Sequence, residues 1–124
     1  MQLLILVLNK SEVLDELLRT FVKEGINGAT IIDSTGMARA LTSGGNEDLP
    51  IFGSLRFIIN EGNPHNKTIF IVLEDDKVFT CIRCIRNVVG DLSRPDVGIL
   101  FTVPVTYYEG IGIIRNNINF DNQK

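Results

Sequence analysis

Three short segments of the chain carry residues whose types and spacing could support chemistry. Cys81 and Cys84 form a C-x-x-C pair, the single histidine is His65, and the segment from Gly36 to Arg39 places small residues beside a cation. A thiol pair can carry redox chemistry or bind a metal ion, and a histidine can act as a base. A glycine segment with an arginine can bind an anion. Which of these applies depends on the element that positions each residue.

The cysteine pair falls in the middle of a predicted amphipathic helix, beside Ile82 and Ile85. Redox thiols gain their low pKa at a helix N-terminus, and a structural zinc site needs four ligands, whereas the chain has no second pair. We therefore predict that both cysteines are small apolar residues bordering the stripe of this helix. His65 lies in a turn-like context without a catalytic motif, so we interpret it as an exposed loop residue and expect no enzyme.

Composition narrows the classes of partner. Twelve Lys and Arg against fifteen Asp and Glu give a net charge of -3, which argues against a surface that neutralises a nucleic-acid backbone. The apolar run from Leu3 to Leu8 is too short to span a membrane and lacks the basic start of a signal peptide. Two cysteines fit a reducing compartment. We therefore expect a cytoplasmic protein with no nucleic-acid partner and no membrane insertion.

The two halves of the chain share one pattern. Residues 3–25 align without a gap with residues 68–90, and each copy reads as an apolar strand, a polar break and an amphipathic helix that ends at a glycine. Asn9 with Glu12 has capping-box spacing for the first helix, and Asp75 or Asp76 is the predicted cap of the second. The predicted apolar stripes are Val13, Leu14, Leu17, Leu18, Phe21 and Val22, and then Val78, Phe79, Ile82, Ile85 and Val89.

Further strands are predicted at 28–33 and 98–105, which makes the order two β-α-β units around a long middle segment. We therefore predict an α+β, ferredoxin-like βαββαβ domain over residues 1–110. It has a four-stranded antiparallel sheet, both helices on one face, and a long loop between strands 2 and 3. We predict that the loop is mobile over about residues 34–50, that residues 51–59 dock on the body, and that the tail 111–124 adds a short edge strand.

The first strand is apolar on both of its faces, with Leu3, Ile5 and Val7 on one and Leu4, Leu6 and Leu8 on the other. Helices can cover only one of them, and three large apolar side chains left in water forgo roughly 1.5–3 kcal/mol each. We therefore expect the second face to be buried against other subunits. The alternative is burial beneath residues 50–67 or the tail. An RNA-recognition module has the same topology, but only Phe70 and Phe101 offer strand aromatics here, on an acidic chain.

This element order, the loop entrance Gly36-x-Ala38-Arg39 and the closing strand from Gly98 to Val105 together resemble the P-II signal-transduction superfamily of nitrogen regulators, over about residues 1–110. The chain looks like a divergent, PII-like member. The resemblance implies a cytoplasmic homotrimer of ferredoxin-like subunits. It also implies that a small effector, usually an adenine nucleotide, binds in clefts between subunits, and that the long loop, the T-loop of the family, engages a target protein.

Residue by residue, the match to the family is partial. The family's loop entrance is Gly-x-Gly-Arg-Gln, and Ala40 stands where the glutamine helps to hold magnesium and 2-oxoglutarate. The turn before the last strand keeps its glycine, but Ile99 replaces a phosphate-binding lysine, so Arg94 is the nearby cation. The effector-binding residues expected from the resemblance are Gly36, Met37, Ala38, Arg39, Gly90, Arg94 and Gly98. They suit an effector of low charge, such as AMP or ADP, with no metal ion.

Simpler interpretations of the same residues stay open. Arg39 could be solvated or paired with a neighbour such as Asp33, and the segment from Gly90 to Gly98 could be a plain helix-to-strand connection. The alternative function is a ferredoxin-like protein-interaction module without any small-molecule effector, in which the loop itself is the binding epitope.

Overall fold

The protein is described by a computed structural model, which covers residues 1–37, 40–41 and 65–110 and the backbone of residues 113–116. The elements of its main body are β1 (Gln2–Leu8), a 3-10 turn η1 (Ser11–Val13), α1 (Leu14–Lys23), β2 (Thr30–Ser34), β3 (Asn66–Leu73), α4 (Asp75–Val89) and β4 (Gly98–Pro104). This order confirms the predicted ferredoxin-like βαββαβ fold.

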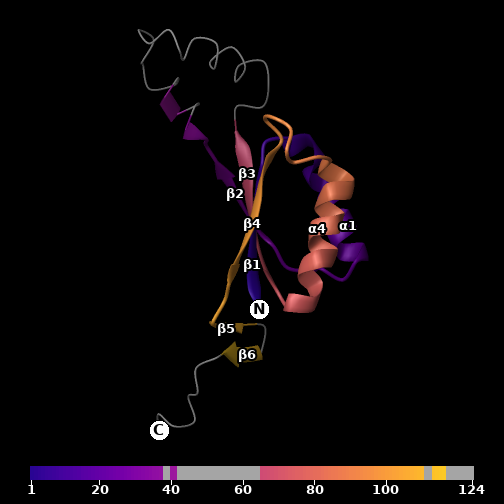
Figure 1. The fold of residues 1–124 in the computed structure, drawn as a ribbon, viewed down its shortest axis with the longest axis vertical. Helices are drawn as coiled ribbons and strands as arrows, with labels where there is room; N and C mark the ends of the chain where they lie inside the picture. Colours follow the sequence, from indigo (N-terminus) through magenta and orange to yellow (C-terminus); the bar gives the residue numbers. More distant parts are fainter. Residues whose placement is uncertain (38–39, 42–64, 111–112, 117–124) are drawn as a thin grey trace.

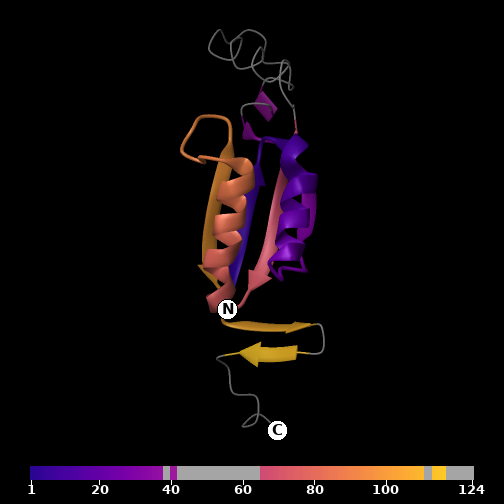
Figure 2. The ribbon, with the colours of Figure 1, turned by 90° about the vertical axis from the view of Figure 1, so that its right-hand side faces the viewer.

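The main sheet has the strand order β2-β3-β1-β4, and every neighbouring pair is antiparallel. Figure 1 shows the sheet edge-on with α1 and α4 on the same side, and Figure 2 shows the two helices lying side by side over that face. Parallel strands joined through a helix cross over right-handed in nearly all proteins. Two such units interleaved in one sheet therefore place both helices on one face, as the sequence predicts.

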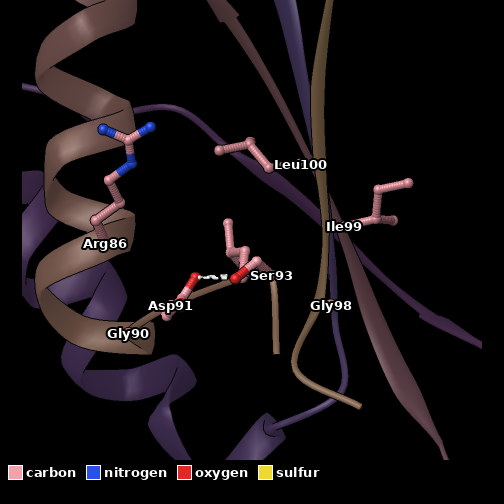
Figure 3. Close-up of a pocket in the computed structure, with 8 residues that line it drawn as sticks. Arg86, Gly90, Asp91, Ser93, Gly98, Ile99 and Leu100 are labelled. Carbon is pink, nitrogen blue, oxygen red and sulfur yellow. Dashed lines mark hydrogen bonds between the residues drawn. The ribbon is translucent and has the colours of Figure 1, made fainter. Parts of the chain in front are cut away.

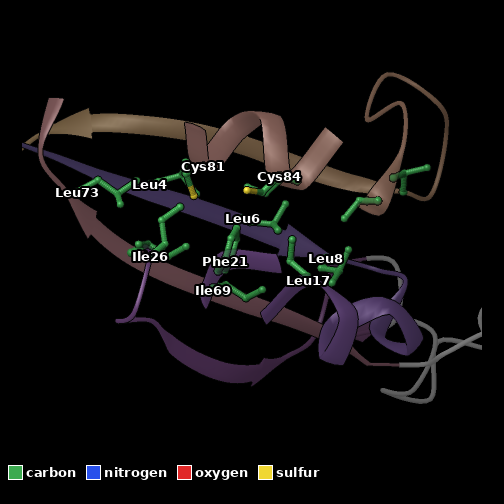
Figure 4. Packing of buried hydrophobic residues seen from close by; sticks show 14 residues of the cluster. Leu4, Leu6, Leu8, Leu17, Phe21, Ile26, Ile69, Leu73, Cys81 and Cys84 are labelled. Carbon is green, nitrogen blue, oxygen red and sulfur yellow. The ribbon is translucent and has the colours of Figure 1, made fainter. Parts of the chain in front are cut away.

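The hydrophobic core lies between the sheet and the two helices (Figure 4). β1 contributes Leu4, Leu6 and Leu8 to this core, and the register places Leu6 opposite Ile69 of β3. The helices supply Leu17, Phe21, Cys81, Cys84, Ile85 and Val89. Both cysteines are therefore buried core residues, as predicted.

Two residues assigned to the helical stripes are not in the core. Val22 is 63% exposed on α1, and Phe79 is 71% exposed on α4, so both predictions are wrong. The buried face of α4 is centred on Cys81 and Ile85, and Phe79 lies two residues, about 200° of helical rotation, from Cys81. The apolar residues of α4 form an arc wider than the sheet can cover, so packing decides which of them are buried.

The predicted caps are also wrong. No side chain of the described residues caps a helix, and the N-cap positions hold Lys10, Val13 and Glu74. The Asn9 backbone N–H donates instead to the Val97 carbonyl at 3.1 Å, which ties the end of β1 to the turn before β4. Asp75 and Asp76 do lie in the first turn of α4, where their charge favours the helix dipole as expected.

The other face of the sheet is covered by neither α1 nor α4. The register brings alternate residues of all four strands onto this open face, and its apolar members are Leu3, Ile5, Val7, Ile32, Phe70, Val72, Ile99, Phe101 and Val103. Ile99 is 57% exposed, Val72 52%, and Phe101 43%. The two-sided strands predicted from the sequence thus leave a large apolar surface uncovered by the described residues.

Polar contacts join β2 to β3 at the end of the sheet nearest the long middle segment. The Ser34 hydroxyl bonds with Thr68 Oγ1 at 2.7 Å and also donates to the Asn66 side chain, on the open face. Asp33 pairs with Lys67, which lowers the pKa of the Asp33 carboxyl through a hydrogen bond and the charge of the lysine. Asp33 therefore has its partner on the neighbouring strand.

Beyond the main sheet, β5 (Tyr107–Gly110) and β6 (Ile113–Asn116) form a separate two-stranded antiparallel sheet (Figure 1). The tail does form a short strand, as predicted, but this strand, β6, pairs with β5 and does not join the main sheet. The predictions for residues 42–64, including most of the loop and the docked segment 51–59, lie outside the described residues. Within the described ranges, no helix is long and apolar enough to cross a bilayer.

The start of β4 approaches β1 so closely that only glycine fits. A Cβ on Gly98 would lie 2.3 Å from the Val7 carbonyl oxygen, and the backbone φ of +151° is one that other residues rarely adopt. The close packing therefore explains why glycine occupies position 98, independently of any ligand.

We predict that Gly98→Ala lowers the free energy of unfolding by about 3 kcal/mol, because the clash with backbone cannot be relieved without moving β4. Urea denaturation measures the loss. The matched control is Gly28→Ala, where a new Cβ meets nothing within 4 Å, so a change within about 0.5 kcal/mol is expected. Equal stabilities of the two variants would contradict the close approach.

Candidate functional site

The turn between α4 and β4 is organised by its own polar groups. Gly90 ends α4 with φ +91° and ψ -154°, a conformation that is essentially restricted to glycine. The Asp91 carboxylate then accepts the Ser93 backbone N–H at 2.9 Å and the Ser93 hydroxyl at 2.7 Å. These bonds lower the pKa of Asp91, so its charge persists well below neutral pH. The turn is thus a structured element that presents a fixed carboxylate.

A cavity of about 690 Å³ lies between this turn, α4 and β4. Its walls come from Arg86 of α4, from residues 90–93 of the turn and from residues 98–100 of β4. In Figure 3 the side chains of Arg86 and Leu100 lie in the space between helix and strand, whereas the Ile99 side chain points to the opposite side of β4. The cavity therefore lies on the helix-covered side of the sheet, within one subunit.

The cavity brings together only part of the predicted site. Gly90 and Gly98 line it, but Arg94 is exposed and is not among its lining residues. The cation in the cavity wall is Arg86, which the sequence analysis missed. The sequence does contain a signal for Arg86, because a helical residue four positions before Gly90 lies on the same face of the helix as Gly90.

The loop entrance lies elsewhere on the sheet. Gly36 is exposed and Met37 is 79% exposed, while Ala38 and Arg39 lie outside the described residues. The register places Asp33, Lys67, Leu8 and Gly98 in one row across the four strands. The loop entrance and the turn therefore share one end of the sheet but lie at opposite edges, about 14 Å apart at a strand spacing of about 4.8 Å.

The backbone of the turn offers few donors for an anion. The Gly90 N–H donates to the Arg86 carbonyl at 3.0 Å, the Ser93 N–H to the Asp91 side chain, and the Arg94 N–H to the Asp91 carbonyl at 3.3 Å. Loops that cradle phosphates use amide groups that are free to point at the ligand. These three amides are therefore not available to an anion, and Arg86 is the cation that the described lining residues offer to one.

The cysteine pair is unsuited to redox chemistry. Burial raises the pKa of Cys81 to about 12, with a further contribution from the neighbouring Cys84, and burial also raises the pKa of Cys84. Both thiols are therefore protonated at neutral pH, and only thiolates are nucleophilic. In the described part of the chain, no group of three or more His, Cys, Asp and Glu residues is arranged to hold a metal ion.

Neither the comparison with known protein families nor the comparison with curated proteins finds a match for this chain. The functional interpretation therefore depends on the geometry above and on the resemblance in the sequence.

We predict that neither thiol of the folded protein reacts with an aromatic disulfide reagent at neutral pH, and that both react once urea unfolds the chain. The raised pKa of Cys81 also predicts that its contribution to stability is complete below about pH 9 and is lost as the pH rises towards about 12. Rapid labelling of the folded protein would contradict the assignment of both cysteines to the core.

Proposed function

We propose that the chain is the subunit of a homotrimeric, PII-like regulatory protein of the cytoplasm. In this proposal a small effector binds in the clefts between subunits, and the long middle loop engages a target protein in response. The protein acts as a sensor and not as an enzyme. The observation that carries the proposal is the uncovered apolar face of the sheet.

The composition of the open face favours a second copy of the chain as its occupant. Besides the apolar residues defined above, its strand positions hold Thr30, Ser34, Asn66 and Thr68, and none of them is charged. Permanent interfaces between identical subunits are apolar and resemble a domain core cut in half. A nucleic acid or an anionic membrane would instead require lysines or arginines on the face. The resemblance to the P-II superfamily supports three subunits.

The separation of the candidate segments favours a site shared between subunits. The loop entrance at Gly36 and the turn from Gly90 to Gly98 share one end of the sheet but occupy opposite edges. One small molecule does not reach both within a single chain. If the open faces pack together, the entrance of one subunit can approach the turn of its neighbour, and an effector between them can couple its occupancy to the loop.

Charge limits the effector that this arrangement accepts. The turn presents the Asp91 carboxylate and one lining cation, and the chain has a net charge of -3. A triphosphate brings several negative charges that these groups do not neutralise. We therefore propose AMP or ADP as the effector, without a bound metal ion.

We predict that the wild-type protein elutes with the mass of three subunits, and that Phe101→Glu converts it to single subunits. The substitution places a charge on the open face, midway along β4, where burial against another copy would be costly. Phe101 is 43% exposed on an edge strand, so the subunit itself should still fold. Size-exclusion chromatography with light scattering gives the mass, and circular dichroism checks the fold.

The matched control is Phe79→Glu, which introduces the same charge on the helical side, where Phe79 is 71% exposed. This variant should keep the wild-type mass. A wild-type protein that is a monodisperse monomer would overturn the assembly and would indicate that another segment of the same chain covers the open face.

We further predict that isothermal titration of the trimer with AMP or ADP gives saturable heat, and that ATP binds more weakly because of its added charge.

Deletion of residues 42–48 should leave effector binding intact and abolish binding to a target protein. If a confirmed trimer gives no heat with AMP, ADP, ATP or cyclic dinucleotides while the loop still governs target binding, the protein is an interaction module without an effector.

A further inference from the structure

Among the described residues, Arg86 is the one cation in the wall of the cavity between α4 and β4. Its side chain is exposed to solvent, and within the described part of the chain no ion pair or hydrogen bond engages its guanidinium. The nearest carboxylate in the wall, Asp91, is already bonded twice by Ser93. The guanidinium is therefore available to a ligand.

Two leucines that line the cavity complement the positive charge of Arg86 with an apolar surface. Leu92 and Leu100 are half-buried and give the cavity an apolar wall, and Figure 3 shows Leu100 facing the same space as the Arg86 side chain. A volume of about 690 Å³ lies within the roughly 300–1,000 Å³ typical of small-molecule sites. One cation beside an apolar wall matches a molecule with one anionic group on an apolar body.

We infer that the Arg86 guanidinium binds the single carboxylate or phosphate-monoester group of a small ligand whose apolar part lies against Leu92 and Leu100. A planar guanidinium donates two parallel hydrogen bonds to either oxyanion. Because Arg86 is the one cation among the described lining residues and the Asp91 carboxylate adds a negative charge to the same wall, the site favours a single oxyanion over a polyphosphate. The site lies within one subunit, on the helix-covered side of the sheet, so it is separate from the cleft between subunits in the proposed function.

The test uses three probes that share one ring and differ in their charged group: phenyl phosphate, benzoate and neutral benzyl alcohol. Their binding is followed through the backbone amide resonances of Gly90, Asp91, Ser93 and Gly98 in the full-length protein. We expect phenyl phosphate or benzoate to shift these resonances saturably and benzyl alcohol to leave them unchanged. The comparison of the two anions identifies the preferred oxyanion.

Arg86→Ala should weaken binding of the preferred anion about 10- to 100-fold, as expected for the loss of charge-assisted hydrogen bonds. The matched control is Arg83→Ala, which removes an exposed arginine one turn earlier on α4 and outside the cavity wall. It should bind as the wild type does. Circular dichroism of both variants checks that the helix is intact.

Two results would overturn the inference: no amide shift with either anion in the wild type, or equal affinities of Arg86→Ala and Arg83→Ala. Failure of the proposed function is a different outcome, because a monomeric protein, or a trimer without nucleotide heat, can still bind phenyl phosphate at Arg86. Conversely, a trimer that binds AMP but shows no amide shift at the turn with phenyl phosphate or benzoate keeps the proposed function and overturns this site.

Discussion

The organisation of this protein depends on one constraint: its four-stranded sheet is apolar on both faces, and the two helices cover only one. Leu4, Leu6 and Leu8 meet the helices and are fully buried, whereas their neighbours Leu3, Ile5 and Val7 point to the open face. The first set forms the core of the subunit, and the second remains uncovered by the described residues.

The end of the sheet that carries the candidate site depends on close backbone contacts. Gly98 allows β4 to pass against the Val7 carbonyl, and the Asn9 N–H bonds to the Val97 carbonyl in the same region. The turn before β4 is therefore held firmly against β1, and the cavity beside it has walls from a helix, a turn and a strand. The same glycine that resembles a ligand-binding residue in the sequence is required by packing.

Much of the fold could be predicted because hydrophobic periodicity is a local property. The order of elements, the strand at 98–105 and the burial of Cys81 follow from spacing alone. The wrong predictions concern the helix faces and caps, where several neighbouring residues are all apolar or all polar and spacing does not single one out. Phe79 belongs to an apolar arc too wide to be buried completely, and the N-cap position of α1 falls on Val13 because the 3-10 turn Ser11–Val13 precedes the helix. Local spacing does not contain that information.

For the candidate site, the sequence by itself determined the chemistry available: few cations, a glycine-bounded turn and no catalytic set. Only the tertiary structure decided which cation lines the cavity, because Arg86 and Arg94 each lie four positions from Gly90 in the sequence but only Arg86 is among the residues of the cavity wall. It also decided that Gly36 and Gly98 lie at opposite edges of one sheet. The physical reason is that strand order and register are set by long-range pairing between β1, β3 and β4, which no local pattern specifies.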